Sequence, residues 1–146
     1  MAGEKLKVSC GTCGTTNFFP VEARGKTVVC GHCKSKLPEP GEIIEPGPEG
    51  IVNLFQNSSL PVLADFYSPT CGPCHMMAPI LERLAVRRAG EITVIKINVE
   101  GNQELAREFD VRGVPTFVVV HKGAERGRQV GAMDESSFAL WAASRT

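Results

Sequence analysis

The stretch Leu60-Pro-Val-Leu-Ala-Asp-Phe-Tyr-Ser-Pro-Thr-Cys-Gly-Pro-Cys74 contains the strongest structural signal in this chain. Its first eight residues are mostly apolar, which is typical of a strand buried on both faces, and the residues after it follow a helical pattern. Cys71 and Cys74 therefore lie where a strand leads into a helix N-terminus. Unpaired N–H groups and the helix dipole favour a thiolate there. We predict that Cys71 is a nucleophile for disulfide exchange, because it comes first and lies nearer solvent, and that Cys74 is the resolving thiol.

The other four cysteines also form pairs with two intervening residues. Sixteen residues separate Cys13 from Cys30, a spacing typical of a four-cysteine zinc site. The first ten residues lack the apolar stretch of a secretory signal, and in a reducing cytosol such pairs are more often metal ligands than structural disulfides. The sequence predicts a cytoplasmic protein whose residues 1–38 form a small module that binds one zinc ion through Cys10, Cys13, Cys30 and Cys33.

The remaining pattern divides the chain further. Residues 39–50 are rich in proline, glycine and glutamate, so we predict a linker with Ile43-Ile44 as a brief edge strand. From residue 51 helices and strands alternate, and the strands at 116–120 and 126–131 are predicted to form a hairpin before a last helix capped by Asp134. Alternation of this kind predicts an α/β sandwich around a mixed sheet. Inside the zinc module, we predict short strands at residues 16–19 and 26–29.

Composition excludes several classes of protein. The chain is 42% hydrophobic with a formal net charge of zero, and no run approaches the roughly 18 apolar residues of a membrane helix. Residues 1–38 contain six basic and two acidic side chains, whereas the rest of the chain has a net negative charge. This asymmetry predicts that the module docks on the acidic body or recruits an acidic partner. Nucleic-acid binding is disfavoured, because zinc thiolates would halve the module's charge and no basic run is present.

These motifs in this order resemble the thioredoxin family. Cys71-Gly-Pro-Cys74 follows Ala64-Asp-Phe-Tyr67, Pro79 lies five residues beyond it, and Gly113-Val-Pro-Thr-Phe117 comes later. The resemblance covers residues from about 41 to 146. With the two zinc-spaced pairs in front, the whole chain resembles the zinc-containing, second type of bacterial thioredoxin. It implies a thioredoxin-like mixed sheet flanked by helices over a domain at 51–146, preceded by a zinc ribbon.

The resemblance also implies a proton relay. Asp65 matches a buried carboxylate behind the dithiol that takes the proton of Cys74, and Lys96 matches its partner lysine. From the residues alone, Asp65 is as compatible with solvent exposure as with burial. Lys96 taken alone is more compatible with an exposed strand position.

A substrate groove is the third implication. The resemblance implies a cis Val114–Pro115 peptide bond beside the dithiol, with Gly131 lining the same groove, where an extended substrate segment pairs with the backbone. One position departs from the family: Thr70 stands where a tryptophan usually precedes the first cysteine, which leaves substrate preference open. The expected substrate-binding residues are Thr70, Gly72, Pro73, Val114, Pro115 and Gly131.

The sequence thus predicts an enzyme that reduces protein disulfides. The resemblance implies thioredoxin reductase as the partner that restores the dithiol, and NADPH as an indirect electron source, because the chain has no dinucleotide-binding fingerprint of its own. An alternative stays open, a zinc-linked redox sensor or holdase in which oxidation of the four N-terminal cysteines ejects the metal. In that case the zinc site is regulatory rather than structural.

Overall fold

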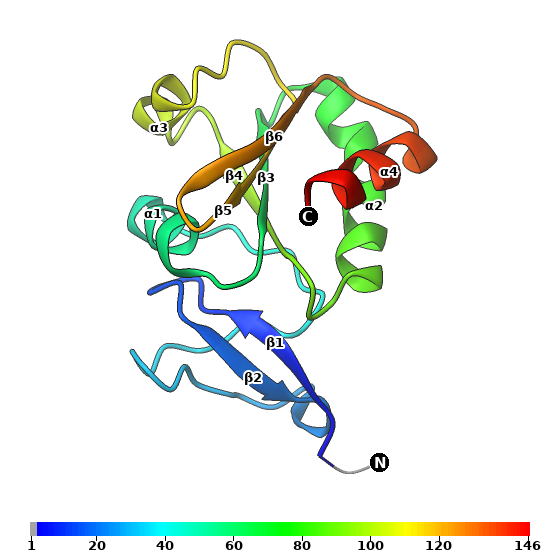
Figure 1. Cartoon of the computed structure of the whole chain (residues 1–146). Helices are drawn as coiled ribbons and strands as arrows, with labels where there is room; N and C mark the ends of the chain where they lie inside the picture. The colour runs from blue at the N-terminus through cyan, green and yellow to red at the C-terminus, as the bar shows by residue number, and fades with distance from the viewer. Residues whose placement is uncertain (1–2) are drawn as a thin grey trace.

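The structure is a computed structural model that describes residues 3–146 (Figure 1). Two short antiparallel strands, β1 (Lys5–Ser9) and β2 (Thr16–Pro20), form a ribbon that is followed by a single 3-10 turn, η1 (Val21–Ala23). The rest of the chain builds a four-stranded sheet in the order β4-β3-β5-β6. Its strands are β3 (Val62–Tyr67), β4 (Thr93–Asn98), β5 (Thr116–His121) and β6 (Ala124–Val130).

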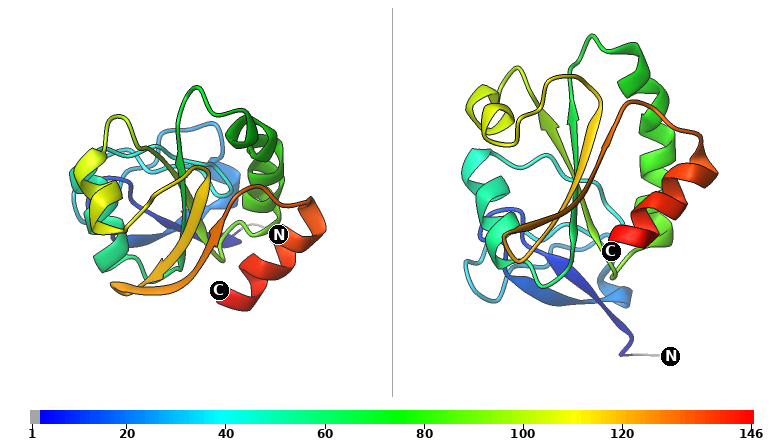
Figure 2. Two further views of the ribbon diagram at one scale, coloured as in Figure 1. Left: turned by 90° about the horizontal axis from the view of Figure 1, so that it is seen from above. Right: turned by 45° about the horizontal axis from the view of Figure 1, so that its top comes forward.

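The sheet is mixed and has helices on both faces, as the sequence predicts. β3 and β4 are parallel, whereas β5 is antiparallel to β3 and to β6. One face is covered by α1 (Pro48–Asn57) and α3 (Gln103–Glu108), and the other by α2 (Gly72–Arg87) and α4 (Glu135–Arg145) (Figure 2). The last helix begins after Asp134, whose carboxylate accepts a hydrogen bond from Ser137 N–H at 2.9 Å. Among the residues described, no helix is long and apolar enough to cross a membrane.

Alternation along the strands divides the core into two clusters. Leu63 and Val94 pack with the residues under α2 and α4, whereas Ala64 packs with the residues under α1. Because side chains alternate along a strand, Asp65 lies on the same face as Leu63, and Lys96 lies on the same face as Val94. The charged side chains of β3 and β4 are therefore both on the face that α2 covers.

One strand prediction in the N-terminal module is wrong. The strand expected at residues 26–29 does not form, and β2 pairs instead with β1. The backbone of this segment turns toward the second cysteine pair: Leu37 N–H donates to Val28 C=O, and Val29 makes only an isolated bridge to Lys36. The alternation of polar and apolar residues at 5–9 is a period-2 signal for β1.

The segment between ribbon and body is packed along the sheet. Ile44 makes a parallel bridge beside β4, with Ile44 N–H donating to Val94 C=O at 3.2 Å and Lys96 N–H donating to Ile44 C=O at 2.9 Å. Ile43 packs on the α2 side and Ile44 on the α1 side. By the same alternation, Glu45 returns to the α2 side, beside Lys96.

The ribbon docks on α1 through backbone contacts and neutral side chains. Asn53 Nδ2 donates to Thr12 C=O, and Asn57 Nδ2 donates to Cys13 C=O, each at 2.9 Å. Gly14, at a φ of 80°, leaves no room for a Cβ, because that atom would meet the backbone of α1. Gly50 is equally confined by the backbone of the ribbon. These close approaches fix the ribbon on the body.

The ribbon lies on the body (Figure 1), and no ion pair joins the two among the described residues. The five ion pairs found among the described residues all lie within the body, for example Arg83 of α2 with Glu135 of α4. The groups that join ribbon and α1 are amides, backbone carbonyls and glycines. The contacts between ribbon and α1 are therefore close fit and hydrogen bonds, and a contribution of the opposite net charges stays a prediction.

Candidate functional site

The two cysteines of the central motif lie at the start of α2. Cys71 is the N-cap residue, and its Sγ accepts a hydrogen bond from Cys74 N–H at 3.1 Å. The two residues are joined as a disulfide with a Cα–Cα distance of 5.2 Å. Cys71 is half-buried and Cys74 is buried. When the bond is reduced, the helix N-terminus and this N–H donor favour a thiolate on Cys71, the more accessible sulfur.

The backbone of Val114 adjoins Cys71. Its Sγ lies 3.7 Å from the carbonyl oxygen of Val114, and the Val114–Pro115 bond is cis, as the resemblance implies. Gly131 N–H donates to Pro115 C=O at 2.8 Å, which places the chain after β6 against this turn. The residues beside the first cysteine, Thr70, Gly72 and Pro73, are exposed. The structure thus brings the dithiol, the cis turn and Gly131 together, with Pro115 buried and with Val114 and Gly131 half-buried.

Asp65 is buried on the face of the sheet that α2 covers. It is 1% exposed, and its Oδ1 has no hydrogen-bond partner among the described residues. Burial raises the pKa of the Asp65 carboxyl to about 7, with Lys96 lowering it and Glu45 raising it further. A carboxyl of this kind holds a proton near neutral pH and can exchange it there.

The raised pKa makes the stability of the protein depend on pH. An unfolded aspartate ionises near pH 3.8, whereas folded Asp65 ionises near 7, so the folded state binds more protons between these values. The contribution of the Asp65 carboxyl to stability is therefore complete below pH 3.8 and is lost as pH rises to about 7. We expect Asp65→Asn to remove this dependence of the free energy of unfolding on pH. The contribution that is lost amounts to a difference on the order of 4 kcal/mol between acid and neutral pH.

Denaturant unfolding of both proteins from about pH 4 to about pH 8 measures this effect. The free energy of unfolding of the variant, relative to that of the parent chain, should rise across the range as the parent loses its contribution. A difference that stays constant over the whole range would show that Asp65 titrates normally in the folded protein.

Lys96 is half-buried rather than exposed, because it lies under an aromatic ring. Its Nζ is 4.4 Å from the centroid of the Tyr67 ring, and its backbone is paired with Asp65 in the parallel register of β3 and β4. The Tyr67 hydroxyl in turn donates to the Glu45 carboxylate. Glu45 was not among the residues predicted from the sequence, since only the bridge of Ile44 to β4 places it here.

The four N-terminal cysteines meet in one cluster. Their sulfur atoms all lie within 4.8 Å of one another, with distances of 3.6 Å between Cys10 and Cys33 and between Cys13 and Cys30. Four sulfurs at about 2.3 Å from a tetrahedral zinc ion would lie about 3.8 Å apart. The residues present therefore fit a single metal ion of that kind.

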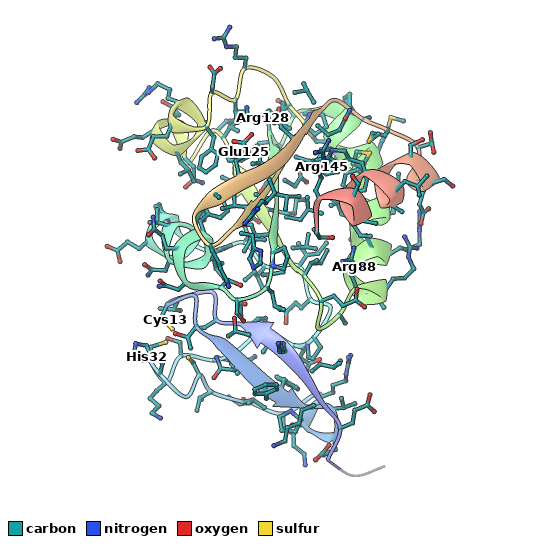
Figure 3. The ribbon with its side chains drawn as sticks, in the orientation of Figure 1. Cys13, His32, Arg88, Glu125, Arg128 and Arg145 are labelled. Atoms are coloured by element: carbon teal, nitrogen blue, oxygen red, sulfur yellow. A yellow bond between two sulfur atoms is a disulfide. The ribbon has the colours of Figure 1, made fainter. Side chains whose placement is uncertain are left out.

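Donors around the cluster also favour thiolate ligands. Backbone N–H groups of Thr12 and His32 point at Cys10 Sγ and Cys30 Sγ, each at 3.4 Å. Asn17, which was not among the residues predicted from the sequence, donates from Nδ2 to Cys30 Sγ at 3.5 Å, and its Oδ1 accepts from Gly31 N–H at 2.9 Å. The side chain of His32 is exposed beside Cys13 (Figure 3), and the group of side chains close enough to share one ion consists of the four cysteines.

The two sulfur sites are at different ends of the molecule. The N-terminus of α2, which holds Cys71, lies at the end of the body away from the ribbon (Figure 1). The cluster of four cysteines lies at the other end, where the ribbon meets α1, near the labelled Cys13 (Figure 3). The three cysteine pairs therefore form two separate centres.

Comparisons with known proteins agree with this geometry. The family model described as Thioredoxin matches residues 51–144. Thioredoxin C-3 of Corynebacterium nephridii is 36% identical over 134 residues, which cover 92% of this chain and 91% of that protein. The thioredoxin of Haemophilus influenzae is 37% identical over 98 residues, covering 67% of this chain and 92% of its own. A solved mutant thioredoxin from Halobacterium salinarum superposes with a TM-score of 0.66 at 36% identity, covering 75% of this chain and 95% of that one.

Proposed function

The chain belongs to the thioredoxin family of protein-disulfide oxidoreductases, and we propose that it reduces disulfide bonds in other proteins through Cys71 and Cys74. One observation supports this assignment above all others. Cys71 caps α2 with its sulfur on the Cys74 N–H and 3.7 Å from the Val114 carbonyl, so the favoured thiolate lies beside the backbone of the cis turn.

The proposed reaction has two exchange steps. The Cys71 thiolate attacks one sulfur of a substrate disulfide, forming a mixed disulfide and releasing the other substrate sulfur as a thiolate. Cys74 then loses its proton and attacks Cys71 Sγ, which forms the Cys71–Cys74 bond and releases the second substrate thiol. Two electrons pass from the dithiol to the substrate. We assign Asp65 as the base that accepts the proton of the Cys74 thiol, with Lys96 as the partner of the Asp65 carboxylate.

We propose that the substrate binds as an extended segment across the groove. Pairing of main-chain groups tolerates many sequences, which suits a reductase with several protein substrates. Thr70 offers less apolar surface than an indole, so partner preference should differ from that of relatives with tryptophan at this position. The backbone along the groove would come from Val114, Pro115 and Gly131, and the exposed rim from Thr70, Gly72 and Pro73.

We assign the four-cysteine cluster to one zinc ion held by Cys10, Cys13, Cys30 and Cys33. The sulfur spacing and the N–H donors support this assignment. When bound, zinc supplies a redox-inert cross-link between the two halves of the module. In this proposal residues 1–38 are a zinc-ribbon module, residues 39–50 a linker whose end forms the first turn of α1, and residues 51–146 the redox domain.

The proposed cycle closes through a partner. A thioredoxin reductase would reduce the Cys71–Cys74 bond with electrons from NADPH, which would not bind this chain itself. Such a cycle requires a reducing compartment, so we place the protein in the cytoplasm.

A trapping experiment tests the proposed function. In Cys74→Ser the resolving thiol is absent, so the mixed disulfide between Cys71 and a protein substrate should accumulate. Intact-mass measurement after mixing the reduced variant with insulin should show one insulin chain per molecule, released by dithiothreitol. Cys71→Ser is the matched control and should trap far less, since the remaining thiol of the pair is buried. Trapping at an N-terminal cysteine instead would contradict the assignment.

The redox-sensor alternative depends on oxidation of the N-terminal cluster. Cys13 and Cys33 are half-buried there, whereas Cys10 and Cys30 are buried. A variant with all four replaced by serine should retain insulin reduction under our proposal. Loss of activity in this variant together with full activity in Cys71→Ser would favour the sensor.

A further inference from the structure

Four polar side chains meet at the edge of the sheet on the face that α2 covers. Asp65 of β3 is paired in register with Lys96 of β4, and the linker runs beside β4 on its other side. The two backbone bonds of Ile44 to β4 hold this linker segment in place, so that the next residue, Glu45, lies beside Lys96. Lys96 is therefore flanked by one carboxylate from the linker and another from β3.

Tyr67 connects the members of this group. Its hydroxyl donates to Glu45 Oε1, and its ring lies against the Lys96 ammonium, with 4.4 Å from Nζ to the ring centroid. No ion pair joins Lys96 to either carboxylate among the described residues. The lysine is thus held by the ring, and Asp65 Oδ1 stays without a partner in the part of the chain that the structure describes.

We propose that Glu45 and Tyr67 are positioning residues that set the proton affinity of Asp65. Glu45 adds a negative charge on the far side of Lys96, which offsets part of the lysine's effect on Asp65. Tyr67 fixes both charges, because its hydroxyl holds Glu45 and its ring holds Lys96. This inference deepens the proposed function, since the proton of Asp65 matters for catalysis only if Cys74 delivers it there.

Electrostatics around Asp65 support the proposal. Burial is the main cause that raises its pKa, and of the charges around it Lys96 lowers the pKa and Glu45 raises it. Three other groups come from β5 and α2, the elements packed beside and over β3 on this face. Phe117 of β5 is the apolar register partner of Asp65, Cys74 of α2 does not titrate in the disulfide, and Glu82 lines a cavity of about 420 Å³ together with Lys96.

The proposal has a consequence for catalysis. A base works best when its pKa lies near the working pH, and a proton held by Asp65 at neutral pH meets that condition. Without the Glu45 charge, Lys96 would stabilise the Asp65 carboxylate more strongly. The carboxylate would then be a weaker base toward Cys74, and the acidic limb of the rate profile for resolution would move to lower pH.

The test is a titration of Asp65 in the oxidised protein, where Cys71 and Cys74 carry no proton. Carboxyl chemical shifts from carbon NMR report its protonation directly, with Asp65→Asn used to assign the signal. Glu45→Gln keeps an oxygen for the Tyr67 hydroxyl and removes only the charge. We expect its Asp65 to bind the proton about two- to fivefold more weakly, the range for one partly exposed charge pair, and less so at high salt.

Two further variants make the test specific. Glu49→Gln removes an equal charge from the exposed first turn of α1 and should leave the Asp65 titration unchanged. In a Tyr67→Phe background, the effect of Glu45→Gln should shrink, because the carboxylate is no longer fixed. Equal shifts from Glu45→Gln and Glu49→Gln, or no shift from Glu45→Gln, would overturn the proposal. The titration needs no substrate, so its outcome is independent of the Cys74→Ser trapping result.

Discussion

Cys71→Ser is expected to reduce insulin-disulfide reduction to the uncatalysed background. A serine hydroxyl is not ionised at neutral pH and cannot accept a disulfide sulfur, so no mixed disulfide forms. The remaining thiol of the pair, Cys74, is buried behind the helix N-terminus and cannot replace it. Turbidity of insulin with dithiothreitol, and NADPH oxidation with a thioredoxin reductase, both measure this loss.

The matched control for this prediction is the variant with Cys10, Cys13, Cys30 and Cys33 all replaced by serine. It loses more thiols than Cys71→Ser, yet it should keep most of the activity provided that its body remains folded. Near-ultraviolet circular dichroism checks that condition. Appreciable activity in Cys71→Ser would contradict the assignment of the nucleophile.

Metal removal is expected to unfold the ribbon while the sheet of the body persists. The apolar core of the N-terminal module, which holds the ribbon and the four cysteines, is small. Apart from the cysteines, its buried members are Val8, Phe19 and Leu37. So small a core cannot order itself, whereas zinc binding to such sites is worth roughly 10–16 kcal/mol. The core of the body, with two large clusters around the sheet, does not include the metal site.

Hydrogen exchange measures this difference between the two parts. After chelation, the backbone amides of β1 and β2 should lose protection from exchange, and so should the side-chain amides of Asn53 and Asn57 that bind the ribbon. The backbone amides of β3 and β5 should stay protected. Cys30→Ser, which removes one buried ligand, should give the same pattern without a chelator. Protection of β1 and β2 in protein shown to be free of metal would mean that the ribbon folds without it.

The central features of the fold follow from short-range patterns. The apolar run before Cys71 predicts β3, and the Asp134 cap predicts the start of α4, because both signals depend on neighbours in sequence. The prediction of a strand at 26–29 is wrong because the backbone hydrogen bonds of that segment go to the chain around the second cysteine pair. The position of that pair depends on the whole cluster, so it is a long-range constraint that local propensity does not contain.

The same distinction applies to the candidate site. The roles of the cysteines were predicted from their spacing and their sequence context, whereas the cis bond and the pairing of Asp65 with Lys96 needed the family resemblance. Glu45 could not be predicted, because its place depends on the register of a single bridge between the linker and β4. The docking of the ribbon was expected from net charge, whereas the close contacts of glycines and asparagines with α1 could not be predicted, because they depend on long-range packing.

The most direct test of two separate sulfur centres is a titration of the fully reduced, zinc-loaded protein with oxidant, with zinc release and thiol positions followed in the same samples. The first equivalent should convert Cys71 and Cys74 to a disulfide, identified by peptide mass mapping, while the zinc content stays at one ion per chain. Zinc released by the first equivalent, with Cys71 and Cys74 still reduced, would contradict the division into a redox dithiol and a metal site.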